Sequence, residues 1–231
     1  MPCIRSAQTN SVPVPELSKS KRKKPADYGL YLVTDRDLSL GRSHHEVVAA
    51  AVKGGVSCVQ LREKELDTRD LIEEARHLKQ LLEHYGVPLI INDRVDVALA
   101  AGADGVHLGQ KDMLLADARR LLGDGALIGI SAECAEDAVR AEKEGADYIA
   151  ISPVYASATK TDTAPPLGLS GIGAVRKLVR LPLIGIGGIN DANIADVVAA
   201  GADGIAVISA IVAAPSPEEA ARLLRRRMGR A

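Results

Sequence analysis

The chain has 231 residues, of which 47% are hydrophobic, and its formal net charge is −1. This length predicts one large α/β domain rather than two small ones, and the near-neutral charge excludes a global field that would recruit nucleic acids. Without Phe or Trp, and with only five Tyr, the sequence is also unlike proteins that stack bases on aromatic side chains. No apolar run reaches the roughly 18 residues of a membrane span. Three scattered cysteines indicate reduced thiols and a cytoplasmic location.

Residues 1–26 differ in composition from the remainder of the chain. They hold four prolines, several serines and a basic cluster at residues 19–24, without apolar periodicity. This composition predicts a disordered basic tail, followed by one folded domain over residues 27–231. A nucleic-acid or localisation patch, or part of a targeting peptide, remain alternatives for the basic cluster.

From Tyr28 onward, short apolar runs alternate with helical patterns. Ser43 and Thr68 are expected to cap the first two helices, and Ser216 with Pro217 is expected to begin a last helix that ends in an arginine run. Strands are predicted at residues 28–33, 57–61, 89–91, 104–108, 127–130, 147–152, 183–186 and 204–208. Helices are predicted at residues 43–53, 68–84, 94–101, 114–122, 135–144, 170–179 and 191–200.

The alternation has a repeated element. Gly-Ala-Asp precedes a predicted strand three times, at residues 102–104, 145–147 and 201–203, which indicates a reused turn from helix to strand. The predicted strands are continuous apolar runs, as expected for a parallel sheet buried on both faces. Eight such units predict the α/β class with a single (β/α)8 TIM barrel, and an open doubly wound sheet is the alternative.

Barrel enzymes carry their chemistry at the carboxyl ends of the strands. Asp93 and Asp112 follow two successive predicted strands, so both acids should project from the same face and could bind a divalent metal. Cations and hydroxyls around them would form an anion site: Arg62, Lys64, Ser131, Thr159 and Lys160. Ion pairs that only hold the rim together are the alternative.

A second anion site is expected after the last strands of the barrel. The Gly187-Gly188 turn leads into a helix, and the last strand ends at Ile208-Ser209, a pattern typical of a barrel phosphate site. The alternative is that the glycines only make tight turns. Two anion sites in one barrel suggest two phosphorylated ligands and a transferase reaction.

The histidines do not indicate nucleophilic catalysis. His44, His45, His77 and His84 fall on predicted helices and are expected at the surface. His107 lies in a predicted strand and is expected to be a core histidine with satisfied hydrogen bonds. No serine or cysteine is paired with a histidine in a plausible way.

These motifs together resemble the thiamine-phosphate synthase family of barrel enzymes, which join the pyrimidine and thiazole halves of thiamine. The resemblance runs from about Tyr28 to Ile211. It is carried by residues 31–35 (YLVTD), 59–64 (VQLREK), 91–94 (INDR), 106–110 (VHLGQ) with Asp112, 157–160 (SATK) and 186–190 (IGGIN).

The resemblance implies a role for each matching residue. Asp93 and Asp112 would bind Mg²⁺, and Arg62, Lys64 and Lys160 would share the charge of the departing pyrophosphate. A pyrimidine carbocation would then be captured by the thiazole nitrogen, with no general base. The pyrimidine diphosphate would be bound by Gln60, Leu61, Arg62, Glu63, Lys64, Asn92, Ser131 and Lys160. The thiazole phosphate would be bound by Ser157, Ala158, Thr159, Gly188, Ile208 and Ser209.

The sequence departs from the family after Ser131, where Ala132-Glu133 replaces a pair that ends in histidine. An acid there is compatible with a diphosphate only if it turns away or meets a cation. The expected partners are two small-molecule substrates, with neither nucleic acid nor membrane, and a homo-oligomer remains open. The alternatives are a thiazole tautomerase of the same barrel family and a non-catalytic regulator that binds thiamine phosphate.

Overall fold

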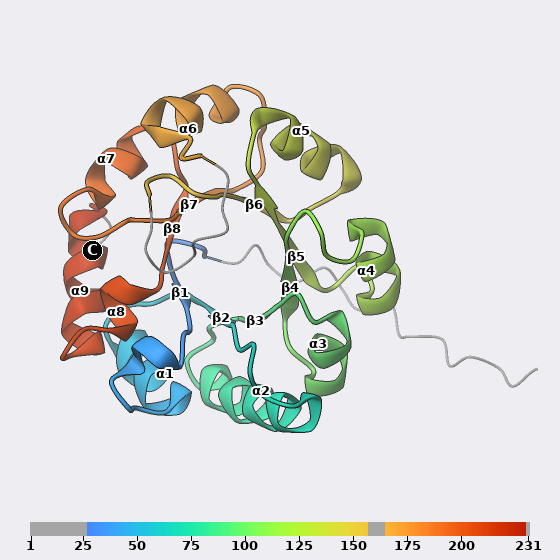
Figure 1. The fold of residues 1–231 in the computed structure, drawn as a ribbon, viewed down its shortest axis with the longest axis vertical. Helices are drawn as coiled ribbons and strands as arrows, with labels where there is room; N and C mark the ends of the chain where they lie inside the picture. The colour runs from blue at the N-terminus through green and yellow to red at the C-terminus, as the bar shows by residue number, and fades with distance from the viewer. Residues whose placement is uncertain (1–26, 157–164, 230–231) are drawn as a thin grey trace, which may run out of the picture.

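The computed structural model describes residues 27–156 and 165–229, and these form a closed barrel of parallel strands inside a ring of helices (Figure 1). Each strand pairs with the next in chain order, and the first strand pairs with the last through Leu30 and Ile205. This closure confirms the predicted (β/α)8 barrel and excludes the open sheet. The predicted tail, residues 1–26, lies outside the described residues.

The elements lie close to their predicted positions. The strands are β1 (Leu30–Val33), β2 (Cys58–Leu61), β3 (Leu89–Asn92), β4 (Gly105–Leu108), β5 (Leu127–Ala132), β6 (Tyr148–Ile151), β7 (Leu183–Ile186) and β8 (Gly204–Val207). The helices are α1 (His44–Lys53), α2 (Thr68–Glu83), α3 (Val95–Ala101), α4 (Leu115–Leu122), α5 (Ala135–Glu144), α6 (Gly168–Arg176), α7 (Ile194–Ala199), α8 (Ser209–Val212) and α9 (Pro217–Arg227). The short turns η1 (Asp37–Ser39) and α8 were not predicted. No described helix is both long and apolar enough to cross a membrane.

Helix caps explain where several helices begin. Ser43 forms a capping box with Glu46 at the start of α1, and the Ser216 hydroxyl accepts a hydrogen bond from the backbone N–H of Glu219 before α9. The prediction for α2 was wrong by one residue, because Asp67 occupies the cap position and Thr68 is the first helical residue. Asp67 makes no side-chain capping bond. The hydroxyl of Thr68 suggested a cap position one residue too late in the sequence.

Side chains alternate between two cores along each strand. Leu30 and Leu32 face the helices, whereas Tyr31 and Val33 face the barrel interior. The interior cluster also contains Tyr148, and its other buried members are mostly small or aliphatic. A packed interior closes the centre of the barrel, so ligands can be held only at its ends.

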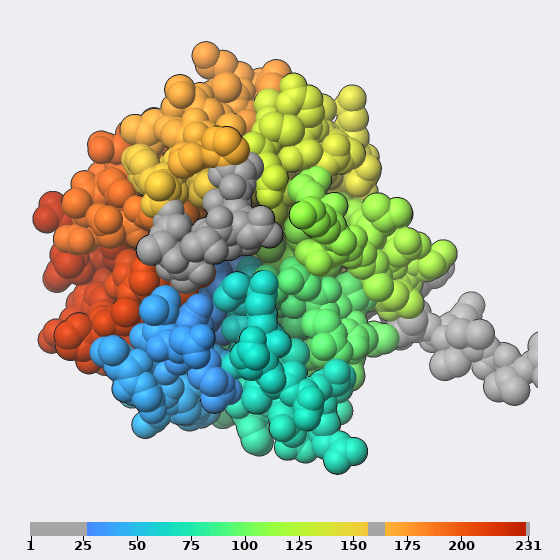
Figure 2. All heavy atoms as spheres, viewed as in Figure 1, coloured from blue at the N-terminus to red at the C-terminus, as the bar shows by residue number. Residues whose placement is uncertain are grey.

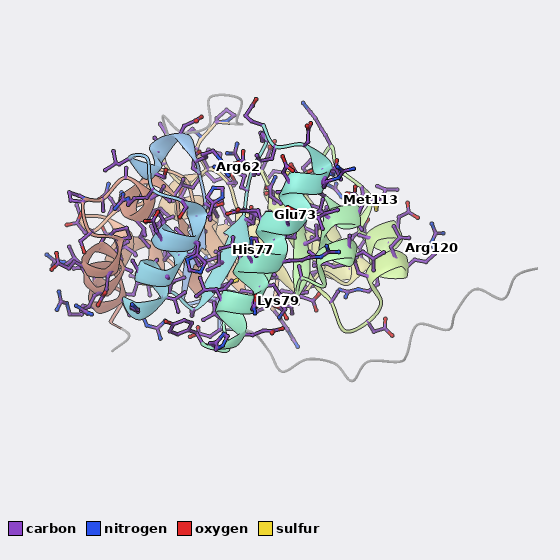
Figure 3. All side chains as sticks on the ribbon, turned by 90° about the horizontal axis from the view of Figure 1, so that it is seen from below. Arg62, Glu73, His77, Lys79, Met113 and Arg120 are labelled. Carbon is purple, nitrogen blue, oxygen red and sulfur yellow. The ribbon has the colours of Figure 1, made fainter. Side chains whose placement is uncertain are left out.

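The repeated Gly-Ala-Asp motif has a structural role. Asp104, Asp147 and Asp203 each accept a hydrogen bond from a backbone N–H at the start of the preceding strand, from the first residue at Leu89 and Leu183 and from the second at Ile128. The same three carboxylates also form ion pairs with cations of α2, α4 and α6, at Lys79, Arg119 and Arg176 respectively. We call these the amino-end latches. Figure 3 shows Lys79 towards the end of the barrel opposite Arg62.

Breaking the most buried latch should destabilise the fold without touching the chemistry. In Asp104→Ala, the buried N–H of Leu89 loses its acceptor and Lys79 loses its partner, so we expect the free energy of unfolding to fall by about 2–4 kcal/mol. Urea denaturation measures this loss. The matched variant Asp203→Ala removes a carboxylate whose side chain is 51% exposed and should cost roughly half as much or less. Equal losses would show that burial does not set the strength of the latch.

The first helix, α1, and the last helix, α9, pack against each other beside β1. The blue first segment lies against the red last segment in the space-filling view (Figure 2), where α1 packs on α9. The guanidinium of Arg42 donates to the backbone oxygens of Val212, Ala214 and Pro215. These contacts join the start of α1 to the segment between α8 and α9 and so close the outer ring of helices.

Candidate active site

A pocket of about 150 Å³ opens at the carboxyl ends of the strands. Its lining combines apolar residues from the barrel interior with charged residues from the loops that follow the strands. The lining residues are Tyr31, Val33, Gln60, Arg62, Lys64, Asn92, Asp93, His107, Gly109, Asp112, Ser131, Ala150, Ser152, Ile186, Ala206 and Ile208. A wider cleft lies at the amino ends, but its charged residues already pair with one another, Lys79 with Asp104 and Glu83, and Arg225 with Asp27.

Two carboxylates meet on one wall of the pocket. Asp93 and Asp112 lie within hydrogen-bonding reach of each other, and burial together with Asp112 raises the pKa of Asp93 to about 6. Asp112 is held by the backbone N–H of Gly109 at 2.7 Å. Asp93 adopts a left-handed backbone with φ 59°, which few residues other than Gly, Asn and Asp tolerate. A cation between the two carboxylates would relieve the repulsion that raises this pKa.

The acids fit a shared rather than a fully enclosed metal. Within the described residues, no group of three or more His, Cys, Asp or Glu side chains could hold an ion alone. Mg²⁺ is commonly held by one or two carboxylates and completes its shell with water and substrate phosphate oxygens. The donor set of Asp93 and Asp112 therefore fits Mg²⁺ bound together with a phosphorylated ligand.

Cations face these acids from the loop after β2. Arg62 and Lys64 both line the pocket, and Lys64 lies near enough to Asp93 to oppose the rise in its pKa. The guanidinium of Arg62 lies 3.6 Å from a carboxylate oxygen of Asp35. The backbone N–H of Arg62 donates a hydrogen bond to the Thr34 hydroxyl. The ion pair at 3.6 Å is long and leaves the guanidinium able to bind an incoming anion.

Glu63, predicted to contact the pyrimidine diphosphate, makes its hydrogen bonds within the loop after β2 and with Arg36. It is not among the residues that line the pocket; its carboxylate instead accepts hydrogen bonds from Arg36 and from the backbone N–H groups of Lys64 and Glu65. Burial alone would raise its pKa, but these donors hold the pKa of Glu63 below its ordinary value. Glu63 thus shapes the loop that presents Arg62 and Lys64.

The histidine beside Glu63 corrects another prediction. His44 was expected at the surface but is buried, with Nδ1 3.2 Å from Glu74 and Nε2 3.9 Å from Glu63. The imidazole therefore sits between a carboxylate of α2 and the carboxylate that braces the β2 loop. It lies at the first turn of α1, where its helical position alone gave no sign that this face is covered.

Neutralising Glu63 should weaken catalysis indirectly. In Glu63→Gln the amide keeps its size but replaces a charged acceptor, so the β2 loop should loosen and kcat/KM should fall about tenfold. Steady-state kinetics measures this, with Glu65→Gln as the control because Glu65 meets this network only through its backbone. An unchanged kcat/KM in Glu63→Gln would show that the loop does not need the carboxylate.

The predicted phosphate turn has the expected backbone. Gly187 and Gly188 have φ values of +103° and +64°, and a Cβ on Gly188 would lie 2.6 Å from the oxygen of Ala156. The side chain of Asn193 braces the turn by accepting from the backbone N–H of Asn190 and donating to the oxygen of Gly188. Gly188 therefore brings the β7 turn close to the β6 loop, a contact that a larger residue could not make.

The structure brings together part of the predicted site. The predicted residues that line the pocket are Gln60, Arg62, Lys64, Asn92, Asp93, Asp112, Ser131 and Ile208. The side chain of Leu61 faces the helix-side core, and Gly188 and Ser209 are not among the lining residues. Ser209 begins the short helix α8. Ser157, Ala158, Thr159 and Lys160 lie outside the described residues.

Other pocket residues were missed by the sequence reasoning. Tyr31 and Ser152 line the pocket, as do interior-facing strand residues such as Ala150 and Ala206. The two-residue alternation along each strand could have identified these inward positions. The departure after Ser131 has no direct effect on the pocket, because Glu133 is exposed and is not a lining residue.

The barrel fold, the paired carboxylates and the neighbouring cations are the features expected of an enzyme that acts on phosphorylated ligands. The sequence matches the family described as "Thiamine monophosphate synthase" over residues 30–211. The chain therefore belongs to the thiamine monophosphate synthase family and is a transferase of thiamine biosynthesis. This membership confirms the resemblance.

Individual relatives agree with this assignment. A thiamine-phosphate synthase from Chloroflexus aurantiacus is 56% identical over 199 residues, which cover 86% of this chain and 92% of the relative. A thiamine-phosphate synthase from Albidiferax ferrireducens is 55% identical over 196 residues, covering 85% and 90% respectively. The solved structure of a thiamine phosphate pyrophosphorylase from Pyrococcus furiosus superimposes with a TM-score of 0.82 at 38% identity, covering 89% of this chain and 97% of that one.

Proposed function

We propose that the pocket joins 4-amino-2-methyl-5-(diphosphooxymethyl)pyrimidine to thiazole phosphate and releases thiamine phosphate and pyrophosphate. The observation that carries this proposal is that two acids, Asp93 and Asp112, and two cations, Arg62 and Lys64, line one small pocket, with Lys64 close enough to act on the charge of Asp93. Acids suited to a metal and cations suited to oxyanions match a diphosphate leaving group, which needs both. The catalytic cations would be Arg62, Lys64 and Lys160.

The protein would act mainly by stabilising the departing diphosphate. Arg62 offers a planar fork for two phosphate oxygens, and Lys64 offers a point charge beside it. Mg²⁺, bound by Asp93 and Asp112, would neutralise charge on the leaving oxygens. Asn92 and Ser131 would orient the pyrimidine diphosphate, and the apolar floor of the pocket would exclude water from the reacting carbon.

The thiazole phosphate would occupy the side of the barrel formed by β6, β7 and β8. The positive-φ turn at Gly187-Gly188 and the end of β8 at Ile208 would offer backbone N–H groups to its phosphate. Ser157, Ala158, Thr159 and Ser209 would complete this subsite.

The two free thiols in the described part of the chain, Cys58 and Cys134, agree with a reducing cytoplasmic location.

One assay tests the proposal. The purified chain is mixed with the pyrimidine diphosphate, thiazole phosphate and Mg²⁺, and thiamine phosphate and pyrophosphate are measured together. We expect equal amounts of both products and none without Mg²⁺. A parallel reaction with only a thiazole phosphate carboxylate tests for isomerisation, which a tautomerase would catalyse. Isomerisation without condensation, or no condensation over a range of Mg²⁺ concentrations, would refute the proposal.

A further inference from the structure

A chain of hydrogen bonds crosses the barrel interior and reaches the pocket at both ends. Gln60 Nε2 donates to the Tyr31 hydroxyl at 2.9 Å, and the hydroxyls of Tyr31 and Tyr148 lie 2.9 Å apart. The Tyr148 hydroxyl lies 3.0 Å from His107 Nδ1, and His107 Nε2 lies 2.9 Å from Ser131 Oγ. These five residues come from five different strands, and we call them the interior relay.

The interior relay is shielded from solvent over most of its length. Tyr31 and Tyr148 are fully buried, Gln60 and His107 are nearly so, and only Ser131 is half-buried. Burial raises the pKa of both tyrosines well above the ordinary value, so both remain neutral phenols that carry a hydroxyl hydrogen. A buried hydroxyl without a partner is costly, so each group is held to the bonds of the relay.

A glycine in β5, Gly129, leaves room for the ring of Tyr148. A Cβ placed on Gly129 would lie 2.0 Å from the ring of Tyr148, so no other residue at this position of β5 leaves the ring in place. His107 stacks on Tyr148 with ring centroids 5.5 Å apart and an interplanar angle of 25°. The position of the Tyr148 hydroxyl is therefore fixed by packing as well as by hydrogen bonds.

The donors and acceptors give the interior relay a direction. Because an amide nitrogen can only donate, Tyr31 accepts from Gln60 and passes its own hydrogen to Tyr148. In that direction Tyr148 would donate to His107 Nδ1, and His107 Nε2 would carry the hydrogen that is donated to Ser131 Oγ. The reverse direction would turn the hydrogen of Tyr31 towards the thiol of Cys58, whose sulfur is a weak acceptor.

This direction determines what the pocket offers to a ligand. With Nε2 of Gln60 engaged by Tyr31, the amide oxygen is the atom left to accept a bond at the pocket wall. With Ser131 Oγ accepting from His107, the serine hydrogen is left to donate to an anion. The Gln60 wall thus presents an acceptor with one remaining Nε2 hydrogen beside it, and the Ser131 wall presents a donor.

We propose that the interior relay fixes this polarity and so selects an aminopyrimidine that bears an anionic group. The inference rests on the proposed function and deepens it. The exocyclic amine of the pyrimidine would donate to the Gln60 oxygen, and a diphosphate oxygen would accept from Ser131. An analogue with oxygen in place of the amine would set two acceptors against each other, and a site built to pair with N–H groups rejects such ligands strongly. Tyr31, Tyr148 and His107 are positioning residues in this scheme.

Single hydroxyl deletions test the proposal. The kcat/KM of the 4-amino pyrimidine diphosphate and of its 4-oxo analogue are compared in wild type, Tyr31→Phe and Tyr148→Phe. Both substitutions keep the ring and remove a link of the relay. We expect the preference for the amine to fall at least tenfold in each, while the KM for thiazole phosphate stays within twofold. Tyr28→Phe is the control, because its ring also packs on Tyr148 but its hydroxyl is not a member of the relay.

A second measurement does not depend on turnover. The ¹⁵N spectrum of His107, assigned with His107→Gln, should show the Nε2-protonated neutral ring in wild type and a mixture of tautomers in Tyr148→Phe. A preference that is unchanged in both variants, or a wild-type His107 protonated at Nδ1, would overturn the relay. A wild type that forms no thiamine phosphate would instead refute the proposed function, and the spectrum would still decide whether the relay has its direction.

Discussion

Asp93→Asn is expected to lower turnover at least roughly 100-fold while making the metal-free fold more stable. The loss of turnover follows because the amide removes half of the paired carboxylate site that would hold Mg²⁺. Asparagine is the informative substitution because it tolerates the left-handed backbone at φ 59°, whereas alanine would add strain. Steady-state kinetics over a range of Mg²⁺ concentrations measures the first effect.

The gain in stability follows from the sign of the pKa shift. The pKa of Asp93 is raised to about 6 in the folded state, so the fold prefers the protonated acid. This contribution is present below the ordinary pKa, near 4, and is lost as the pH rises through about 6. The metal-free wild type should therefore gain stability between pH 7 and pH 5. Because the group is partly exposed, screening limits the gain to about 1 kcal/mol.

Thermal denaturation separates the metal site from a general change in stability. Asp93→Asn should lack the pH-dependent gain, and Mg²⁺ with pyrophosphate should stabilise the wild type but not the variant. Asp96→Asn is the control, since Asp96 is three residues away, exposed and paired with Arg94. Equal stabilisation of wild type and Asp93→Asn by Mg²⁺ with pyrophosphate would contradict the metal assignment.

Sequence periodicity was sufficient for the barrel because every strand carries the same local pattern. Continuous apolar runs and recurring Gly-Ala-Asp turns are properties of neighbouring residues, and they place the carboxyl ends of the strands without reference to distant contacts. The paired acids Asp93 and Asp112 were predictable for the same reason, since Asp93 directly follows β3 and Asp112 lies in the loop after β4. Only the parallel order of the sheet was needed to bring them together.

What the sequence could not show depends on contacts between distant residues. Glu63 fits a substrate-binding motif, but Arg36 turns its carboxylate into the loop. His44 fits an exposed helix position, but residues of α2 and the β2 loop cover it. The hydroxyls of Tyr31 and Tyr148 are 117 residues apart in the chain and meet only because the barrel closes. Local spacing carries no information on which inward side chains touch across a closed sheet.

Arg62→Lys is expected to reduce kcat about 100-fold, and Arg62→Ala about 1,000-fold, with little change in substrate binding. Lysine keeps the positive charge but loses the planar fork that can bind two phosphate oxygens at once. If Arg62 acts on the charge that develops on the departing diphosphate, kcat and kcat/KM should fall by the same factor. Single-turnover release of pyrophosphate measures the step directly, because slow product release cannot mask it.

The control for Arg62 lies in a neighbouring loop. Arg94→Lys alters an arginine that pairs with Asp96 and Thr68 and is not among the pocket-lining residues, so turnover should stay within about twofold. A rise in KM with unchanged kcat in Arg62→Ala would contradict a role in leaving-group stabilisation. That result would assign Arg62 to binding of the ground-state substrate. Lys64 and the metal would then be the groups that stabilise the departing pyrophosphate. The long ion pair between Arg62 and Asp35 favours the first outcome, because it keeps the guanidinium at the pocket without neutralising it.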